Sequence, residues 1–368
     1  MKTAVILGCL VLIFLPLLGV AQNSRPLVGE PLVVVKDGKY GYIGHNGSMI
    51  IRPQYLWGTA FENGFAAVFV CGRVVYIDAD GKLYSRPATR QTSELSRKKW
   101  NGKFGFVDGS GQWKIAASFD DALPFSEGMA AVEVHDKWGF IDATGRMVIA
   151  PVFEAAFYFR EGVATAMTES DDVIIDKTGK VLARGFKQLR GVVAEGRAPV
   201  SRDDKYGYLD LNGGIAIPLV YDDADLFSRG LAPVKKGAKW GYIDRQGATA
   251  IPFIYDSAGV FGDGLAPVRI GNESGFITPS GKFAFRLEFD YAPGFWRLDG
   301  DKDISRFWTK GGAFGYVNTS GKVIWGPTVG SPDHAPLLGW SEQDKVRSCE
   351  GLPESIRKTV ATFPEIDD

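Results

Sequence analysis

Lys-Trp-Gly-Tyr-Ile-Asp-Arg-Gln-Gly (Lys239–Gly247) is the stretch that decides the fold, because close copies of it recur along most of the chain. Lys-Trp-Gly-Phe-Ile-Asp stands at Lys137–Asp142, and Lys-Tyr-Gly-Tyr-Ile stands at Lys39–Ile43. The final glycine belongs to a series of nine turn glycines: Gly47, Gly81, Gly111, Gly145, Gly179, Gly213, Gly247, Gly281 and Gly321. They are 34 residues apart, except for one step of 30 residues and a last step of 40. A fixed period of this length predicts an array of tandem repeats.

Each repeat is expected to hold three short strands. Trp240–Asp244 is aromatic and β-branched, which is typical of a strand, and the next residues form a turn that begins with aspartate and ends with glycine. Gly241 is expected to allow a close backbone approach or a bulge. A second strand should end at Pro252, because proline cannot donate to a ladder. A third, Leu265–Arg269, should pair with the aromatic-glycine strand of the next copy.

These strands predict an all-β fold, since almost no helical periodicity is found between Lys36 and Gly326. We expect tandem three-stranded β-meanders stacked as an open superhelical or solenoid-like array. A closed β-propeller-like ring is the alternative. The open array is preferred because a propeller blade normally needs four strands and about 40–45 residues, and because nine blades would exceed the usual range of about four to eight.

The chain divides into four segments, by numbers 1–21, 22–35, 36–327 and 328–368. Residues 1–21 are typical of a secretory signal peptide, with Lys2 before an apolar run and small residues before cleavage after Ala21. A secreted or periplasmic protein is therefore expected, without stable membrane insertion after cleavage. Residues 22–35 are a lead-in, 36–327 hold the nine repeats, and 328–368 are a C-terminal cap or tail.

The tail and the cysteines concern the C-terminal end of the array and its possible closure into a ring. Leu352, Val360 and their neighbours place apolar groups along one face of a short helix, which we expect to dock on the array as a cap. Cys71 and Cys349 remain after signal cleavage. An exported protein permits a disulfide between them, and two free buried thiols are the alternative. A bridge would bring the tail to the second repeat and favour ring closure.

The repeat as a whole resembles the WG (or KWG) repeat family. The resemblance rests on the Lys-[Trp/Tyr/Phe]-Gly-[Tyr/Phe]-[Ile/Val]-Asp strand, the Asp-x-x-Gly turn, the Pro-x-[Phe/Tyr] step and the Glu-Gly-Leu-Ala-x-Val segment, and it runs from Lys36 to Pro327. It implies a bacterial protein built of tandem β units, with a binding or scaffolding role and no catalytic motif. Two copies, at Val74–Asp78 and Asp172–Asp176, lack the central glycine, so their packing must differ.

Composition and motifs indicate little chemistry. The 42 basic and 43 acidic residues leave a formal charge of −1, which does not favour nucleic acid. Aspartates such as Asp142 and Asp244 recur before the turn glycines and are interpreted as turn caps rather than calcium ligands. The three histidines lack partners at zinc-ligand spacing, and serine-nucleophile and phosphate-loop motifs are absent from the sequence. We expect no cofactor and no enzymatic activity. A glycan hydrolase that uses a carboxylate pair on one face is the alternative.

Departures from the repeat are the candidate sites, since they are not needed to build the unit. The first is the basic stretch Ser85–Lys99, which includes Arg90, Lys98 and Lys99. It is interpreted as a loop that meets an acidic partner or an anionic glycan, or as a solvated excursion in a weakened repeat. Trp57 and Trp113 replace smaller side chains of other copies and are weaker candidates.

The second departure is Phe295–Lys310, where the period lengthens. Its candidate ligand-binding residues are Trp296, Arg297, Asp299, Asp301 and Trp308. Tryptophans beside carboxylates and arginine suit carbohydrate or peptide recognition, because an aromatic face supplies area and charged groups orient the ligand. The alternative is a cap in which the tryptophans cover the end of the array. The function expected from the sequence is an exported binding scaffold for a protein or a cell-envelope glycan.

Overall fold

The computed structural model describes residues 29–62, 64–85, 95–186, 193–295, 303–329 and 342–363. Within these ranges, nine small antiparallel sheets follow one another along the chain, and two helices come after them. The all-β repeat array and the short helical tail predicted from the sequence are confirmed. The signal-peptide prediction, residues 1–21, lies outside the described residues. The first strand begins at Leu32, so it lies largely within the predicted lead-in, residues 22–35.

We number the repeats 1 to 9 by their sheets. Repeats 1 to 3 contain β1 (Leu32–Lys36), β2 (Lys39–Ile43), β3 (Met49–Tyr55); β4 (Phe65–Val70), β5 (Arg73–Asp78), β6 (Leu83–Tyr84); and β7 (Ser96–Trp100), β8 (Lys103–Val107), β9 (Trp113–Phe119). Repeats 4 to 6 contain β10 (Asp121–Ala122), β11 (Met129–Val134), β12 (Lys137–Asp142), β13 (Met147–Phe153); β14 (Ala155–Ala156), β15 (Val163–Met167), β16 (Asp172–Asp176), β17 (Val181–Phe186); and β18 (Ala198–Arg202), β19 (Lys205–Leu209), β20 (Ile215–Tyr221).

Repeats 7 to 9 contain β21 (Asp223–Ala224), β22 (Leu231–Lys236), β23 (Lys239–Asp244), β24 (Thr249–Tyr255); β25 (Ser257–Ala258), β26 (Ala266–Ile270), β27 (Glu273–Ile277), β28 (Phe283–Arg286); and β29 (Ile304–Trp308), β30 (Ala313–Asn318), β31 (Val323–Val329). As expected, the third strand of one sequence unit pairs with the aromatic-glycine strand of the next, for example β22 with β23. Four sheets carry a further two-residue strand on the inner side, β10, β14, β21 and β25.

The glycine of the aromatic-glycine strand fits a bulge in its neighbour. Trp138 pairs with Phe153 and Phe140 with Ile149, so β13 holds extra residues opposite Gly139. A Cβ on Gly139 would lie 2.5 Å from the carbonyl oxygen of Ile149. Pro151 lies inside β13 and does not end it, which corrects the predicted strand end. The proline is tolerated because β13 is an edge strand and the ladder is already interrupted there.

Neighbouring repeats pack through the turn glycines. A Cβ on Gly145 would lie 3.2 Å from the side chain of Ile115 in the preceding repeat, and Gly179 has the same relation to Ile149, at 3.0 Å. Among the described residues, eight hydrophobic clusters each join two adjacent repeats. The sheets therefore follow one another in a curved row, in which such a cluster of described residues joins every pair of neighbours except repeats 2 and 3.

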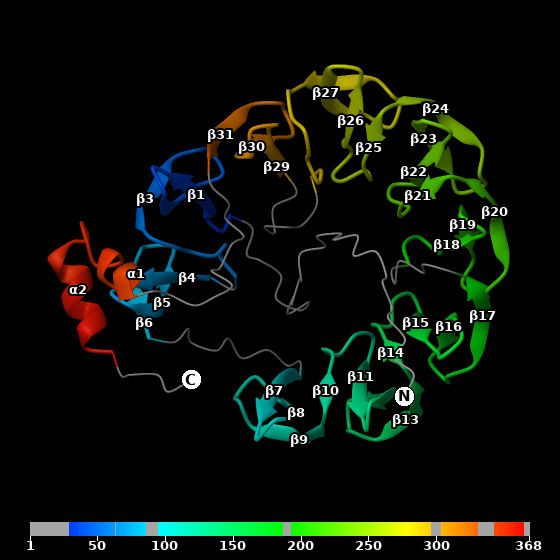
Figure 1. The fold of residues 1–368 in the computed structure, drawn as a ribbon, viewed down its shortest axis with the longest axis horizontal. Coiled ribbons are helices and arrows are strands. Elements are labelled where there is room, and N and C mark those ends of the chain that lie inside the picture. The colour runs from blue at the N-terminus through cyan, green and yellow to red at the C-terminus, as the bar shows by residue number, and fades with distance from the viewer. Residues whose placement is uncertain are drawn as a thin grey trace, which may run out of the picture.

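The row curves until its two ends meet (Figure 1). The hydroxyl of Tyr316 in repeat 9 donates a hydrogen bond of 2.9 Å to the carbonyl oxygen of Val33 in repeat 1. One hydrophobic cluster contains side chains of both repeats, among them Leu32 and Phe314. A Cβ on Gly47 would lie 2.8 Å from the carbonyl oxygen of Ile324, the contact made at other junctions. The closed-ring alternative therefore describes the curvature better than an extended stack.

One junction of this ring differs from the others. We call the junction between repeats 2 and 3 the seam. The described residues provide no hydrophobic cluster that spans it, and a Cβ on Gly111 would have no atom within 4 Å. Figure 1 shows β6 and β7 standing apart at this point. Among the described residues, the ring is thus joined through repeats 9 and 1 and interrupted between repeats 2 and 3.

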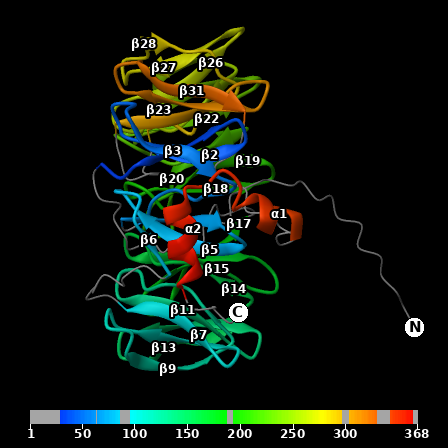
Figure 2. The ribbon, with the colours of Figure 1, turned by 90° about the vertical axis from the view of Figure 1, so that its left-hand side faces the viewer.

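The tail docks on repeat 2, as a cap. Its helices α1 (Glu342–Arg347) and α2 (Glu354–Ala361) lie against the outside of this repeat (Figures 1 and 2). Leu352 and Val360 are buried in the cluster shared by repeats 1 and 2. The outer strand β6 has only two residues where β3 has seven, so α2 covers an edge that is left short. No helix in the described part of the chain is long and apolar enough to span a membrane.

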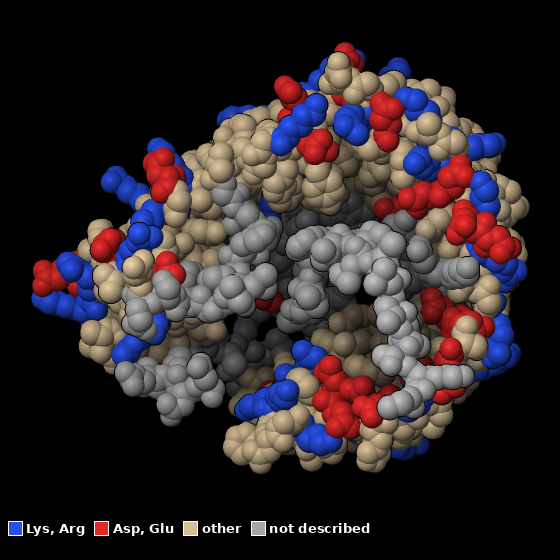
Figure 3. Space-filling model, viewed as in Figure 1, with Lys and Arg blue, Asp and Glu red and all other residues tan. Residues whose placement is uncertain are grey.

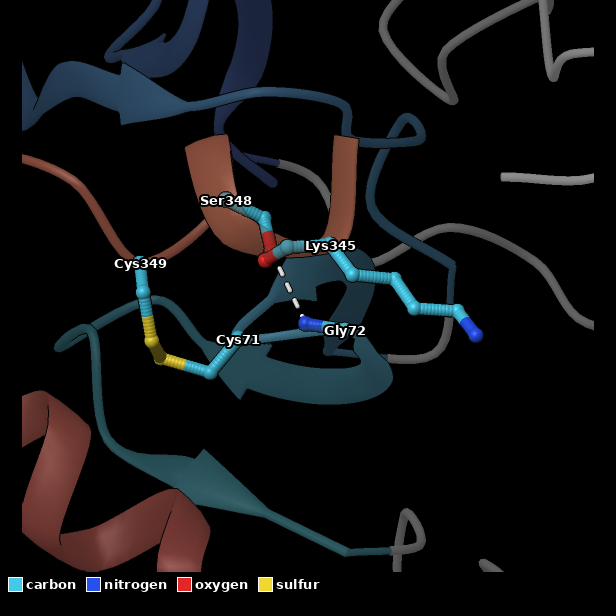
Figure 4. The surroundings of a disulfide bond; sticks show 5 residues. All are labelled: Cys71, Gly72, Lys345, Ser348 and Cys349. Carbon is cyan, nitrogen blue, oxygen red and sulfur yellow. Dashed lines mark hydrogen bonds between the residues drawn. A yellow bond between two sulfur atoms is a disulfide. The ribbon is translucent and has the colours of Figure 1, made fainter. Parts of the chain in front are cut away.

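A disulfide between Cys71 and Cys349 fastens this tail (Figure 4). Of the two alternatives left by the sequence, the structure therefore has the bridge. Beside it, the N–H of Gly72 donates a hydrogen bond of 2.8 Å to the hydroxyl of Ser348. Cys71 and Gly72 form the turn between β4 and β5, so the tail is attached to one end of the repeat as well as to its outer edge.

Candidate ligand-binding surface

The recurrent aspartates of the turns are used for backbone capping. Oδ1 of Asp142 accepts hydrogen bonds from the N–H groups of Thr144, at 2.9 Å, and Arg146, at 3.1 Å. The hydroxyl of Thr144 also donates to it and, as the largest influence, lowers the pKa of Asp142 to about 2. Asp244 caps its own turn in the same way. The prediction of turn caps is confirmed, and these carboxylates are occupied by the fold.

In repeats 3, 4, 6 and 7, the lysine at the start of the aromatic-glycine strand also has a structural use. Nζ of Lys239 lies 2.6 Å from Oδ1 of Asp256, while Oδ2 of Asp256 accepts the N–H of Gly271 at 2.6 Å. Lys103 and Asp120 form the corresponding pair in repeat 3, and this lysine lowers the pKa of Asp120. The pair links a strand to the following hairpin turn, so it has a structural role.

The glutamates of the Glu-Gly turns connect consecutive repeats. The carboxylate of Glu127 accepts the N–H groups of Glu161, at 2.6 Å, and Gly162, at 3.0 Å. Glu161 in turn accepts from Glu195 and Gly196, and the same contact continues to the next repeat. These N–H groups are available because the turn residues have positive φ, 51° at Glu161 and 85° at Gly162. The third recurrent acid therefore also serves assembly.

Several predicted site residues lie outside the described residues: Arg90, Trp296, Arg297, Asp299 and Asp301. Trp308, the described member of the second departure, pairs with Tyr291 through an isolated bridge, and their ring centroids are 5.6 Å apart. Trp308 is only partly exposed and packs against the cluster that joins repeats 9 and 1. This packing gives Trp308 a contact within the fold, whereas Tyr291 is 60% exposed.

The first departure forms an exposed strand at the seam. All five residues of β7 are exposed, whereas the first four residues of the equivalent β11 are buried. Trp100 is 62% exposed and Trp113, at the start of β9, is 36% exposed. Nζ of Lys98 lies 5.7 Å from the ring centroid of Trp113. We call Lys98, Trp100 and Trp113 the seam patch.

The register of the sheet explains why these side chains meet. Lys98 pairs with Gly105, which has no side chain, so the lysine can extend across β8 toward Trp113. Trp113 pairs with Val107 and therefore lies on the same side of the sheet as Lys98. In repeat 4 the position of Lys98 is taken by Val132, which is fully buried against repeat 3. The patch thus occupies the face with which other repeats pack on their predecessor.

Lys99 points to the other side of β7. Its Nζ lies 5.0 Å from the ring centroid of Phe104, and Arg97 stacks on the same ring at 4.8 Å while donating to Asp121 and to the carbonyl oxygen of Ala122. Arg97 is therefore held by repeat 4. Figure 3 shows basic side chains over β7–β9 and acidic side chains gathered over the neighbouring sheet β10–β13.

Sequence reasoning identified part of this site. It selected Lys98 and Lys99, and it named Trp113 as a weaker candidate, but it missed Trp100. Trp100 could have been found from the alternation of side chains along β7. Every second residue of this strand, Ser96, Lys98 and Trp100, aligns with a residue of β11 in repeat 4; these are Ala130, Val132 and Val134. Two of those three aligned positions have become polar on the face that should be buried.

Comparison with known proteins concerns the repeat rather than a site. The model of the WG containing repeat matches five segments, residues 40–70, 104–138, 138–169, 206–240 and 240–273. No curated protein sequence matches the chain.

Solved structures with related layouts share very little sequence. One is a eukaryotic initiation factor, with a TM-score of 0.49, 11% identity, and coverage of 81% of this chain and 95% of the other. Another is Kluyveromyces lactis Hsv2p, with a TM-score of 0.36, 9% identity, and coverage of 56% and 74%. A third is PorZ of Porphyromonas gingivalis, with a TM-score of 0.28, 10% identity, and coverage of 82% and 38%. These identities say nothing about what this chain binds.

Proposed function

This chain is a WG repeat protein, and we propose that it is an exported, non-enzymatic binding scaffold that presents the surface of its ring to a cell-envelope glycan or to another protein. One observation carries the proposal. The recurrent lysine, aspartate and glutamate side chains are used to cap turns and join repeats, whereas Lys98, Trp100 and Trp113 at the seam are not used in this way. We therefore assign binding to exposed side chains that are not used to hold the repeats together.

Export and lack of catalysis have separate support. The pattern of residues 1–21 and the bridge between Cys71 and Cys349 both suit an oxidising compartment. The recurrent carboxylates face backbone N–H groups and lysines of their own fold, as at Asp142 and Asp256. A hydrolase needs two carboxyl groups available to the substrate, at a separation of about 5–10 Å.

The test is a binding screen with product analysis. The purified protein is applied to immobilised glycans, peptidoglycan and envelope proteins, and the eluate is analysed for released reducing ends. Retention of a ligand without new reducing ends supports the proposal. Release of reducing ends that is lost on changing one carboxylate would show a hydrolase, and a failure to retain anything across the screen would refute a binding scaffold.

A further inference from the structure

We propose that the seam patch is a binding site for an acidic polysaccharide, in which the two indoles contact sugar rings and the ammonium group of Lys98 pairs with a carboxylate or sulfate group. The inference rests on the proposed binding function and names the ligand class and the site. It concerns one repeat only, the third, where β7 replaces a buried strand with an exposed one.

The lysine of the patch is available for an anion. Lys103, Lys137, Lys205 and Lys239, at the start of the aromatic-glycine strands, pair with carboxylates. Among the described residues, no carboxylate pairs with Lys98, and its ammonium group lies beside the ring of Trp113 instead. A cation over an aromatic face is held in place but keeps its donors directed to solvent. Lys98 can therefore accept a ligand anion without breaking an ion pair of the fold.

The tryptophans supply the apolar part of the site. Indole rings combine a large apolar face with one polar N–H, which suits a ligand that is partly apolar and partly hydrated. Trp100 and Trp113 lie on the side of the sheet that also carries Lys98, on β7 and β9. The exposure of Trp100, 62%, is far above that of the valine at the same place in repeat 4, which is only partly exposed. The two rings and the lysine face solvent as a set.

The size of the patch favours a glycan over a protein partner. Trp100 is 62% exposed and Trp113 36%, so together they offer about the area of one tryptophan, roughly 150–250 Å², which is less than a third of the ~800 Å² per partner that a stable protein interface buries. A polysaccharide needs no such area, because many weak contacts along one polymer add up. Charge is complementary as well, since the ammonium group of Lys98 would face an anionic chain.

Four variants of the full chain test the site. Trp100→Ala with Trp113→Ala removes the indoles, and Lys98→Glu reverses the charge. The matched controls are Met147→Ala, which changes the position of Trp113 in repeat 4, and Lys236→Glu, an exposed lysine at the position of Trp100 in repeat 7. Circular dichroism and the melting temperature of each variant establish that the fold is retained.

The probes are polygalacturonate, heparin, neutral dextran and poly-glutamate, measured by affinity electrophoresis and calorimetry. We expect binding to the two acidic glycans, with at least a tenfold loss in the tryptophan variant and in the lysine variant, and no change in the controls. Added salt should weaken wild-type binding and have less effect on the lysine variant. A preference between the first two probes distinguishes carboxylate from sulfate.

Other outcomes separate this inference from the proposed function. Glycan binding that is unchanged in the patch variants overturns the site and leaves the binding function intact. Equal binding of poly-glutamate and polygalacturonate, or an equal loss in Lys236→Glu, shows charge alone and overturns the sugar contact. If the wild-type protein retains nothing in the broader screen, the proposed function itself fails.

Discussion

The repeat glycine offers the sharpest test of how the sheets are built. In Gly139→Ala, the new Cβ would lie 2.5 Å from the carbonyl oxygen of Ile149 and 2.8 Å from the nitrogen of Pro151. Both are backbone atoms of the bulge, so they cannot rotate away as a side chain would. Overpacking of this kind costs about 1–3 kcal/mol, and the backbone contact puts this site near the upper value.

The corresponding fall in melting temperature can be worked out. The described array has roughly 300 ordered residues, and unfolding entropy is about 2 cal/mol/K per residue. A loss of about 3 kcal/mol then lowers the melting temperature by roughly 5 °C. Scanning calorimetry measures the shift, and hydrogen exchange locates it, because repeat arrays can lose one unit before the others.

A matched control separates close approach from backbone conformation. Gly128 has φ of 82°, and a Cβ added to it would have no atom within 4 Å, so Gly128→Ala meets only the left-handed strain of about 1–2 kcal/mol. Gly139→Ala should therefore cost more, with faster exchange in β12 and β13. A smaller shift for Gly139→Ala than for Gly128→Ala would refute the bulge explanation of the repeat glycine.

Three further predictions concern the contacts between repeats. Burial would raise the pKa of Glu127, but the N–H of Gly162 and nearby groups outweigh this effect and lower the pKa. Glu127→Gln should therefore lower the melting temperature at pH 7, and the difference from wild type should vanish as the pH falls through the lowered pKa. A difference that stays constant in melts from pH 7 to pH 3 would contradict this prediction. Cys349→Ser should cost about 2–5 kcal/mol and expose the tail to limited proteolysis, an idea that fails if the tail stays as protected as in wild type. Tyr316→Phe removes the hydroxyl that donates to the carbonyl oxygen of Val33 and should lower the free energy of unfolding by about 1–2 kcal/mol, with an unchanged radius of gyration in small-angle scattering. An unaltered melting temperature would show that ring closure does not use this hydrogen bond.

Much of the fold could be predicted because the repeat makes each element visible many times. The turn caps, the close approach at Gly139 and the pairing of strands across sequence units follow from residue types at fixed offsets. The place of Pro151 inside its strand could not be predicted in this way. A proline marks a missing donor, but only the register shows that the ladder is already broken opposite the glycine.

Ring closure was harder to predict, because it depends on a small rotation between neighbouring sheets that accumulates over the whole array. No single junction reveals that sum. The contact between Tyr316 and Val33 joins residues 283 positions apart, and the ring-closing residues resemble those of any other junction. The candidate site was partly predictable for the opposite reason. Lys98 and Lys99 depart from the repeat, and departures are visible against a regular background.

The position of the seam follows from two local changes on either side of it. Repeat 3 presents Ser96 and Lys98 where repeats 2, 4, 6, 7 and 8 present alanine and valine, so burying that face would desolvate a charged group without a partner. Repeat 2 has a two-residue outer strand, and its missing edge is covered by α2, which is fastened through Cys349. The ring can therefore be joined between repeats 9 and 1 and, among the described residues, remain interrupted between repeats 2 and 3. A sequence that restored valine at position 98 should then pack repeat 3 more closely on repeat 2 and, if the seam patch binds as proposed, lose its ligand in the same step.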